Sequence, residues 1–489
     1  MKNIVTSFLT LVTLLMLFTG RASCLAPPAG DLPSQDRGCP PKLFLPTGNP
    51  AIPIEHIIVI VQENHSFDNY FGTYPGANGI PAGTRLPKVP NGPLVLAPFL
   101  ATTTTPHDLG HSWLDAAVSY DNGLMDGFYW SAYARSAAYY GQGIVTPAAD
   151  PNLVVIVPKT TTTTSTKLTN TTSNDTEILS PQGFTDDEDE LAPDVGSQNE
   201  ALATKLATAS SSPPTQPSWA INAVSYYDGK MIPNYWNYAR HYTLCDNFFS
   251  SLRASSQPNH LYIVAAQSGG LATNYSPTLY TSYYFFPAIT DKLIQAGVTW
   301  KHYSDQSPQT ETRGNPLAGF VQIITNPAQL ANLVPTSQFY TDLTNRGLPQ
   351  VCWLKPASPE SEHPPNDITK GMQYVTHLVN AVMKSPYWNN CAIIITWDDY
   401  GGFYDHVPPV QTDKYGFGFR VPCLVISPYA LPNTVVHTQY DFTSILKLIE
   451  TKFLLSPLTE RDNAANNMLD CFNFSQAPLP TDIIQKRQK

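Results

Sequence analysis

The chain has 489 residues, of which 42% are hydrophobic and 13% charged, and its net charge is −10. This length and apolar content allow a large buried core. Binding to a nucleic-acid backbone needs clustered Lys and Arg, so the acidic balance argues against nucleic acid as a partner. No feature of the composition indicates an obligate protein partner.

The N-terminal segment, residues 1–24, has the features of an export signal. Lys2 precedes an apolar run over residues 8–18, and small side chains follow this run. The run is too short to cross a bilayer, so we interpret it as a signal peptide that is removed on export. We therefore expect the mature protein, residues 25–489, to be secreted, either extracellular or periplasmic.

The chain has seven cysteines, and none of them forms a Cys-x-x-Cys pair. A zinc site built from cysteines is therefore not expected. Cleavage after Cys24 would leave six cysteines, an even number that is compatible with disulfide bonds in an oxidising compartment. Cys391 and Cys423 lie in apolar runs, where buried free thiols are the simpler interpretation.

Three continuous apolar runs rich in β-branched residues predict buried strands; they cover residues 56–61, 392–397 and 421–426. Helical patterns lie between them, at residues 289–296, 327–333 and 371–383. Alternating strands and helices predict an α/β fold, a three-layer sandwich with a largely parallel central sheet. We assign residues 25–489 to this one domain.

Residues 141–216 do not fit this pattern. Positions 160–172 are almost entirely Thr, Ser, Lys and Asn, and the acidic run 186–190 follows. A segment of this composition cannot bury much apolar surface. We therefore expect a flexible, low-complexity insertion within the domain.

Oxygen-bearing side chains follow two of the predicted strands. Glu63 and Asn64 come just after the first apolar run, and Asp398 and Asp399 just after the second. Because ligand sites in open α/β sheets form at the carboxyl ends of strands, we expect these four side chains to meet and to bind a divalent cation. Adjacent carboxylates also repel each other unless a cation or a proton lies between them. The alternative is that these residues only form turns and helix caps.

Two blocks of sequence resemble the signature of a known family. Residues 63–72, ENHSFDNYFG, are similar to E-N-R-S-F-D-H-Y-F-G, and residues 398–407, DDYGGFYDHV, are similar to D-E-x-G-G-F-Y-D-H-V. Both motifs belong to the phosphoesterase family that contains bacterial and plant non-specific phospholipases C and secreted acid phosphatases. Shorter blocks are also similar to motifs of this family and occur in the same order along the chain, at residues 108–113, 125–128, 226–228, 245–249, 362–365 and 420–428. The resemblance implies an alkaline-phosphatase-like fold and a metal-dependent enzyme whose metal ligands include the four oxygen-bearing residues above.

The family's nucleophile lies in a T/S-x-P-N-R block, and Ser256 occupies that position in the sequence SSQPNH. The resemblance implies that Ser256 attacks phosphorus and lies beside the metal, because a hydroxyl is a weak nucleophile until its proton is displaced. An alternative from the residues alone is that Ser256 caps a helix that begins near Pro258. Both can hold, since a helix N-terminus also favours a phosphate anion.

Three positions depart from the family pattern. Ser256 stands where the phospholipases C of this group often have Thr, whereas its acid phosphatases use Ser. His65 and His260 replace arginines, so two positive groups near a phosphate site are lost. Protonated imidazoles could restore this charge at acidic pH; alternatively, both histidines are packed and neutral.

Other histidines also fall in matching blocks. The resemblance places His111 and His363 in the active site, where they could hydrogen-bond phosphoryl oxygens or protonate the leaving alkoxide. His406 could orient the metal-binding carboxylates, and His302 offers a less specific match. For each of them, an ordinary buried or surface histidine is the competing interpretation.

These features together predict a secreted, metal-dependent phospholipase C that acts on glycerophospholipids such as phosphatidylcholine through Ser256. The alternative is a broad-specificity acid phosphatase that uses the same site on phosphomonoesters. Carboxylate, amide and hydroxyl ligands suit zinc, calcium or manganese, among which we favour zinc. The aromatic residues 283–286 could give transient contact with a membrane surface, although burial in the core is the commoner role of such residues.

Overall fold

The computed structural model describes residues 48–89, 91–136, 218–274, 284–305, 307–309 and 312–485. All of them belong to one compact unit, Pro46–Lys489. The signal peptide and the insertion at 141–216 lie outside the described residues, so both stay predictions.

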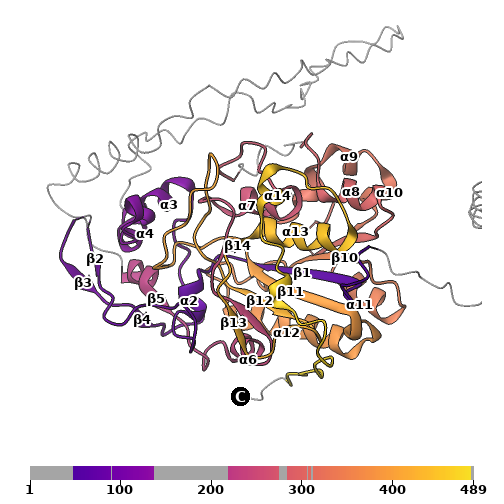
Figure 1. The fold of residues 1–489 in the computed structure, drawn as a ribbon. Coiled ribbons are helices and arrows are strands. Elements are labelled where there is room, and N and C mark those ends of the chain that lie inside the picture. The colour runs from indigo at the N-terminus through magenta and orange to yellow at the C-terminus, as the bar shows by residue number, and fades with distance from the viewer. Residues whose placement is uncertain are drawn as a thin grey trace, which may run out of the picture. The chain divides into compact units, whose positions relative to one another are not determined.

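The centre of the described fold is an eight-stranded sheet with the order β13-β6-β12-β11-β1-β10-β8-β9 (Figure 1). Its strands are β1 (His56–Gln62), β6 (Thr243–Cys245), β8 (Trp300–Ser304), β9 (Leu333–Val334), β10 (Val351–Lys355), β11 (Cys391–Trp397), β12 (Cys423–Ile426) and β13 (Thr434–Val436). Neighbouring strands run parallel, except that β12 is antiparallel to both of its neighbours. The predicted α/β fold with a largely parallel sheet is therefore confirmed.

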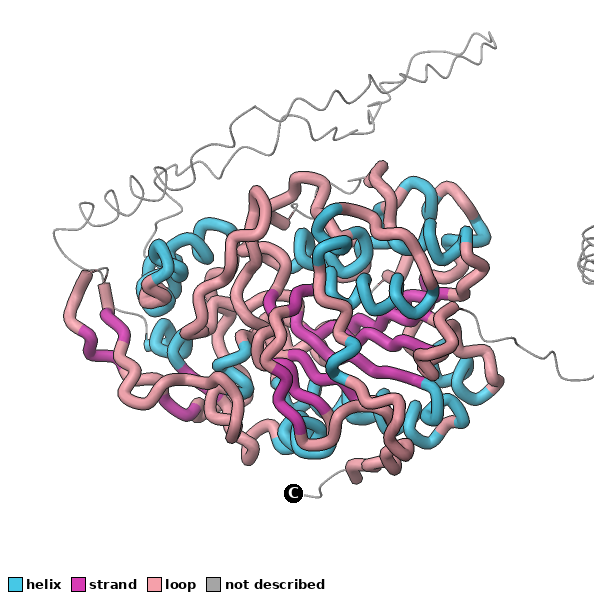
Figure 2. The backbone as a smooth tube through the Cα atoms, in the orientation of Figure 1, coloured by secondary structure: helices cyan, strands magenta, loops and turns pink. Residues whose placement is uncertain are grey.

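Helices cover both faces of the sheet, as Figure 2 shows in cyan around the magenta strands. On one face lie α7 (Ser256–Ala265), α8 (Ile289–Gln295), α13 (Phe442–Phe453) and α14 (Glu460–Ala464), and on the other lie α6 (Pro233–His241), α11 (Ser337–Thr344) and α12 (Ile368–Lys384). With both faces covered, every residue of β11 and all but the first residue of β1 are buried, which explains the continuous apolar runs. The three predicted helices correspond to α8, α10 (Pro327–Leu330) and α12.

The third predicted strand, residues 421–426, is β12, which runs against its neighbours. The chain leaves β11 at Trp397 and re-enters the sheet at Cys423, which pairs with Thr396. The intervening residues 398–422 therefore begin and end at the same edge, and a strand that starts there has to run in the opposite direction. The sequence pattern does not indicate this, because a strand buried on both faces is equally apolar in either direction.

Shorter elements lie outside the central sheet. They are α2 (Phe67–Phe71), β2 (Leu86–Pro87), β3 (Leu94–Leu96), β4 (Phe99–Leu100), α3 (Trp113–Tyr120), η1 (Asp121–Gly123), α4 (Phe128–Ser136), η3 (Ser218–Val224), β5 (Ser225–Tyr226), β7 (Phe248–Phe249), η4 (Pro316–Gly319), α9 (Val321–Ile324), η5 (Pro386–Asn390), β14 (Tyr440–Asp441) and η6 (Leu469–Cys471). Residues of α3, α4 and η3 form a second apolar cluster with Tyr400, Phe403 and Phe419, which come from the chain between β11 and β12. This cluster packs the region around α3, which follows His111, against the segment after β11.

The five described cysteines, Cys245, Cys352, Cys391, Cys423 and Cys471, are buried free thiols. This agrees with the simpler interpretation of Cys391 and Cys423. The Sγ atoms of Cys245 and Cys471 lie 3.6 Å apart.

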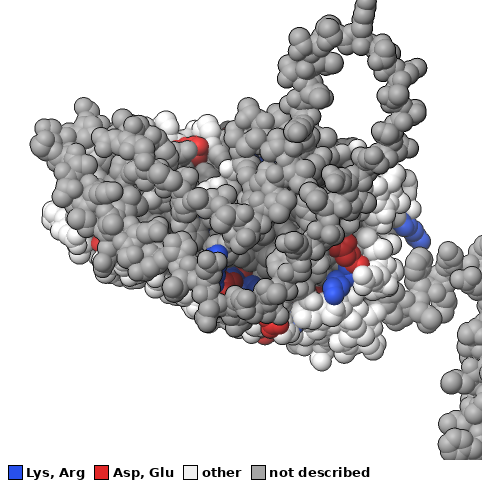
Figure 3. Space-filling view, turned by 90° about the horizontal axis from the view of Figure 1, so that it is seen from above, with Lys and Arg blue, Asp and Glu red and all other residues white. Residues whose placement is uncertain are grey.

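Where described residues are visible in Figure 3, a few basic side chains lie beside acidic ones. Among the described helices, none is long and apolar enough to cross a membrane. Of the aromatic residues at 283–286, Tyr284 is buried and Phe285 is 58% exposed. An exposed aromatic side chain is not by itself a membrane site, so membrane contact stays a prediction.

Candidate active site

The ends of β1 and β11 bring the predicted oxygen ligands together. The two strands pair in parallel with Gln62 opposite Trp397, so the residues that follow them leave the sheet side by side. The backbone N–H of Asn64 donates to Asp398 Oδ1 (3.1 Å), and Asn64, Asp398 and Asp399 are at most 1% exposed. The structure thus has these residues together at one edge of the sheet, as predicted from their positions at the strand ends. Their role in metal binding remains a prediction.

Two glycines allow this close approach. Gly401 has φ +62°, and a Cβ at this position would lie 2.1 Å from the carbonyl oxygen of Asn64. Gly402 has φ +80°, and its Cβ would lie 2.5 Å from Leu109 Cβ. Because only glycine fits such contacts at these angles, the Gly-Gly pair joins the segment after β11 to both the Asn64 and the His111 segments.

Ser256 is the first residue of α7, and its side chain points toward the acidic residues. Ser256 Oγ donates to Asp399 Oδ2 (3.4 Å), whereas the N-cap position belongs to Ser255. The alternative in which Ser256 caps a helix near Pro258 is therefore wrong, because the helix already includes Ser256. The hydroxyl lies at the helix N-terminus, where the first backbone N–H groups favour an anion.

Asn259 fixes the loop that precedes α7. Its buried side chain accepts a hydrogen bond at Oδ1 from Leu252 N (3.0 Å). Its Nδ2 donates to the carbonyl oxygens of Leu252 (3.1 Å), Ala254 (3.0 Å) and Ser255 (3.3 Å). The amide thus ties the residues before Ser256 to the first turn of the helix, and this sets the position of the Ser256 hydroxyl.

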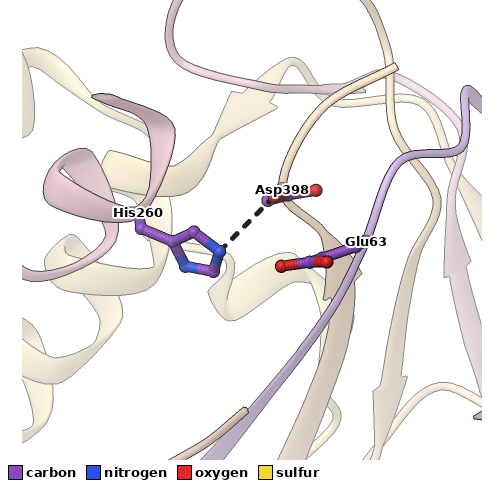
Figure 4. Close-up of side chains that lie close together, drawn as sticks. All are labelled: Glu63, His260 and Asp398. Atoms are coloured by element: carbon purple, nitrogen blue, oxygen red, sulfur yellow. Dashed lines mark ion pairs between the residues drawn. The ribbon is translucent and has the colours of Figure 1, made fainter. Parts of the chain in front are cut away.

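His260 contacts the site in a way that the sequence did not predict. It lies one turn after Ser256 on the same face of α7, since residues i and i+4 share a face, and Figure 4 shows its ring directed at Asp398 beside Glu63. His260 Nε2 is 3.4 Å from Asp398 Oδ2. One ligand atom from each of Glu63, His260 and Asp398 lies within 4.8 Å of the others. The four-residue spacing between Ser256 and His260 is the signal in the sequence that could indicate this position.

Lys355 is a second site residue that the sequence did not predict. It is the last residue of β10, which pairs in parallel with β1 and therefore ends at the same edge of the sheet. Lys355 is 6% exposed, and its Nζ lies 2.5 Å from Glu63 Oε1. A lysine at the end of an apolar strand is the available signal, because a buried ammonium needs a partner.

The charges in this region do not balance. The ammonium of Lys355 interacts with the carboxylates of Glu63 and Asp398, and Asp399 adds a third carboxylate beside them, which gives a formal balance of −3 + 1 = −2 when these four groups are ionised. Burial, followed by the charge of Asp398, raises the pKa of Asp399 well above its ordinary value. Burial would also raise the pKa of Asp398, but His260 and Lys355 together outweigh it and lower this pKa. A divalent cation would compensate the remaining charge.

Three buried polar atoms in this region have no well-formed hydrogen bond among the described residues: Asn64 Oδ1, and the pair Asp398 Oδ2 and His260 Nε2, which lie 3.4 Å from each other. Unpaired buried polar atoms are costly, so their convergence indicates a site for a bound group. Carboxylate, amide and imidazole donors suit a divalent metal, and the residues present therefore fit the predicted cofactor. We name the following residues the strand-edge cluster: Glu63, Asn64, Ser256, His260, Asp398 and Asp399.

The two predicted catalytic histidines lie beside the strand-edge cluster. His111 Nδ1 donates to Leu109 O (2.9 Å), so that Nε2 of the neutral ring accepts from Asn64 Nδ2 (3.4 Å). His363 Nδ1 donates to Pro364 O (2.6 Å), and the centroids of the His111 and His363 rings are 5.9 Å apart in an edge-on arrangement. The structure brings both histidines to the site, and their catalytic roles remain predictions.

Glu362 anchors the segment that carries His363. Its fully buried carboxylate accepts hydrogen bonds from the side chains of Gln62, Tyr70, Tyr235 and Trp397. Burial, the largest influence, raises the pKa of Glu362 to about 7. The segment before His363 is thus tied to the core below the strand-edge cluster.

Two other histidines are packed in the interior. His65 lies between the rings of Tyr70 and Phe403, with centroid distances of 4.4 Å and 4.9 Å, and burial lowers its pKa to about 4. Burial also lowers the pKa of His302, on β8, to about 3. The structure therefore favours the packed, neutral alternative for His65, which does not replace the charge of an arginine.

His406 belongs to a different acidic group, which we name the arginine cluster: Asp68, Asp405, His406 and Arg420. The fully buried guanidinium of Arg420 donates to Asp405 Oδ1 (2.9 Å) and to Asp68 Oδ1 (3.0 Å). His406 Nδ1 lies 2.7 Å from Asp68 Oδ2. Contrary to the prediction, His406 therefore orients Asp68 and not the carboxylates of the strand-edge cluster.

The sequence matches the phosphoesterase family over residues 54–149 and 157–456. The chain therefore belongs to this family, and it is a phosphoric ester hydrolase, as the motifs in its sequence predict.

Three relatives illustrate the similarity within the family. "Phospholipase C B" of Mycobacterium tuberculosis is 27% identical over an alignment of 498 positions, gaps included, and the alignment covers 88% of this chain and 79% of that protein. "Non-hemolytic phospholipase C" of Pseudomonas aeruginosa is 22% identical over 86% of this chain and 57% of that protein. "Non-specific phospholipase C1" of Arabidopsis thaliana is 29% identical over an alignment of 302 positions, gaps included, and the alignment covers 54% of this chain and 54% of that protein.

Solved structures that align with part of the chain include two proteins of low sequence identity. Human ectonucleotide pyrophosphatase/phosphodiesterase 5 aligns with a TM-score of 0.34 and 12% identity over 50% of this chain and 94% of that chain. A protein in the alkaline phosphatase superfamily from Vibrio parahaemolyticus aligns with a TM-score of 0.32 and 12% identity over 48% of this chain and 63% of that chain.

Proposed function

We propose that this protein is a secreted, metal-dependent phospholipase C that hydrolyses the bond between glycerol and phosphate in glycerophospholipids such as phosphatidylcholine. The products are diacylglycerol and a phosphorylated head group. The proposal depends above all on the Ser256 hydroxyl, which lies at a helix N-terminus and 3.4 Å from Asp399 in a group of buried carboxylates. A relative that aligns with 88% of the chain is named a phospholipase C, which supports this substrate class.

The proposed reaction has two steps. Ser256 Oγ attacks phosphorus and the bond from phosphorus to the glycerol oxygen breaks, which gives a phosphoserine and the glycerol alkoxide. Asp399 Oδ2, which accepts the hydrogen bond of the Ser256 hydroxyl, takes its proton, and His111 or His363, in its doubly protonated form, donates the Nε2 proton to the alkoxide and becomes neutral. Water then attacks phosphorus and loses a proton to the neutral histidine; the bond from phosphorus to Ser256 Oγ breaks, and Asp399 returns its proton to Ser256.

Several fixed groups stabilise negative charge in this reaction. The positive end of the α7 dipole, at which Ser256 lies, would stabilise negative charge on the phosphoryl group. A divalent cation held by the strand-edge cluster would neutralise phosphoryl charge and favour ionisation of the hydroxyl. Burial alone would raise the pKa of Glu63, but the charge and hydrogen bond of Lys355, together with the charge of His363, lower it, so that Glu63 is available as an ionised ligand.

A second candidate is a secreted acid phosphatase that acts on phosphomonoesters with the same residues. The serine at position 256 favours it, because the family's acid phosphatases use Ser where its phospholipases C often use Thr. Turnover of p-nitrophenyl phosphate and of p-nitrophenylphosphorylcholine separates the two candidates. A strong preference for the monoester would support the phosphatase.

The main test is release of phosphocholine from phosphatidylcholine by the purified protein. Ser256→Ala should reduce the rate by at least about 1,000-fold, because only residual catalysis remains without a nucleophile. Ser255→Ala removes the neighbouring hydroxyl and should retain most of the activity. Full activity of Ser256→Ala would exclude Ser256 as the nucleophile, and activity that survives complete chelation would exclude the metal.

Export is tested separately, because it rests on residues 1–24. When the full chain is expressed, the protein recovered from the medium or periplasm should begin at or near residue 25. Recovery only from the cytosol, with Met1 in place, would contradict export and leave the enzymatic proposal intact.

A further inference from the structure

We infer that His260 is a ligand of the proposed metal and that its imidazole nitrogen makes the site prefer Zn²⁺ to Ca²⁺. The inference rests on the proposed metal-dependent function, and it concerns a residue that departs from the family motif.

The surroundings of His260 are those of a metal ligand. The residue is 3% exposed, and its Nε2 has no hydrogen-bond partner among the described residues. The carboxylate oxygen Asp398 Oδ2 lies 3.4 Å from this nitrogen, and the two atoms form an ion pair when His260 is protonated but no well-formed hydrogen bond. Figure 4 shows that Glu63 extends into the same space. A single cation between these side chains would satisfy all of them, and buried polar atoms are rarely left unsatisfied.

The replacement of arginine by histidine changes what position 260 can do. A guanidinium is permanently charged and has no acceptor, so an arginine here could bind phosphate but not a metal ion. A neutral imidazole has an acceptor nitrogen and is a common metal ligand. Lys355 already supplies a buried positive charge next to Glu63, so that the site does not need a second one from His260.

A nitrogen ligand alters which metal the site prefers. Ca²⁺ takes many oxygen ligands, whereas catalytic Zn²⁺ sites combine a few nitrogen, sulfur or oxygen ligands from the protein with an open position. Glu63, Asp398 and His260 form such a mixed set, and the open position is available to Ser256 or to a phosphoryl oxygen. Without His260 the donors would be oxygens alone, which suits Ca²⁺ better.

The test is a calorimetric titration of the purified protein with Zn²⁺ alone and with Ca²⁺ alone. His260→Asn should lower the Zn²⁺ affinity by at least about tenfold, the loss that follows even when only a supporting partner of a ligand is removed. The Ca²⁺ affinity should change much less. His406→Gln is the matched control, because it removes a histidine from the arginine cluster, and it should leave both affinities unchanged.

X-ray absorption at the zinc edge gives a second readout that does not depend on affinity or activity. Wild-type protein loaded with Zn²⁺ should show the scattering of an imidazole ring, and His260→Asn should lose it. If this variant does not fold, the wild-type spectrum still decides, because a spectrum without imidazole scattering would overturn the inference. If the wild type and His260→Asn bind Zn²⁺ with equal affinity and give the same spectrum, His260 is not a ligand, and the metal-dependent function still stands. Failure of the wild-type protein to bind any divalent metal would overturn both.

Discussion

Two acidic clusters in this protein have similar compositions but different surroundings. Each combines a histidine with carboxylates from the segments after β1 and β11, and in each the ligand atoms lie within 4.8 Å of one another. In the arginine cluster, Arg420 donates to both Asp68 and Asp405, and His406 contacts Asp68. In the strand-edge cluster, by contrast, Asp398 Oδ2 has no hydrogen-bond partner among the described residues.

The difference shows that acidic side chains alone do not identify a metal site. Buried carboxylates need a cation or good hydrogen bonds, and the arginine cluster has a guanidinium in contact with both of its acids. In the strand-edge cluster, the ammonium of Lys355 interacts with Glu63 and Asp398, and the third carboxylate, Asp399, is in electrostatic contact with both of these acids. A permanent internal cation therefore distinguishes a structural acidic cluster from one that can take a metal.

Removal of Arg420 from the arginine cluster should have the largest effect on the stability of the folded protein. Arg420→Met leaves Asp68 and Asp405 buried without their partner, which costs about 3–5 kcal/mol. The matched change Asp398→Asn, made in metal-free protein, removes a repulsion with Asp399 and should alter the free energy of unfolding by no more than about 1 kcal/mol. Urea denaturation measures both values, and equal losses would contradict the distinction between the clusters.

Glu362 sharpens the comparison, because neutral donors hold this buried carboxylate. Its pKa rises from 4.5 to about 7 in the folded protein, so between these pH values the folded state keeps a proton that the unfolded chain has released. The free energy of unfolding should therefore fall by up to about 3 kcal/mol as the pH rises from 4.5 to 7. The control is Glu362→Gln, whose side chain does not titrate. If the difference in free energy of unfolding between the wild type and this variant stays constant from pH 4.5 to 7, the raised pKa of Glu362 is refuted.

Removal of the metal should also distinguish the two clusters, through a change in stability somewhat smaller than the two effects above. A ligand present at 100 times its Kd stabilises the folded state by about 2.7 kcal/mol, so a chelator should lower the Tm of the wild-type protein. The same chelator should have no effect on Asp398→Asn, whereas His406→Gln should respond like the wild type. An equal shift in Asp398→Asn would mean that the metal binds elsewhere.

The smallest effect is expected at His406. His406→Gln removes one contact of Asp68, but Arg420 continues to neutralise this carboxylate. The loss in free energy of unfolding should be about 1 kcal/mol, typical of one hydrogen bond. A loss as large as that of Arg420→Met, in the same urea experiment, would show that the histidine and not the arginine stabilises the cluster.

The parts of the fold that the sequence predicts are those with a local signal. β1 and β11 are recognisable because a strand buried on both faces needs an unbroken apolar run. The meeting of Asn64 with Asp398 follows, because parallel strands present their carboxyl ends at one edge. The direction of β12 is not recognisable, since it depends on where residues 398–422 begin and end.

The parts of the site that the sequence does not predict depend on long-range packing. Lys355 reaches Glu63 only because β10 pairs with β1, and His260 reaches Asp398 only because α7 packs with Ser256 facing Asp399. The Ser256–His260 spacing and the lysine at the end of an apolar strand mark these positions in the sequence, but neither pattern identifies the residue that is contacted.

The hydrogen bonds of Asn259 have a consequence for substrate binding. They hold the loop before Ser256 in place within the folded chain itself. The conformational entropy of this loop is therefore lost once, during folding, and not again each time a phosphate ester arrives. With the nucleophile pre-organised, the favourable contacts of the substrate can lower the barrier to reaction instead of ordering the enzyme.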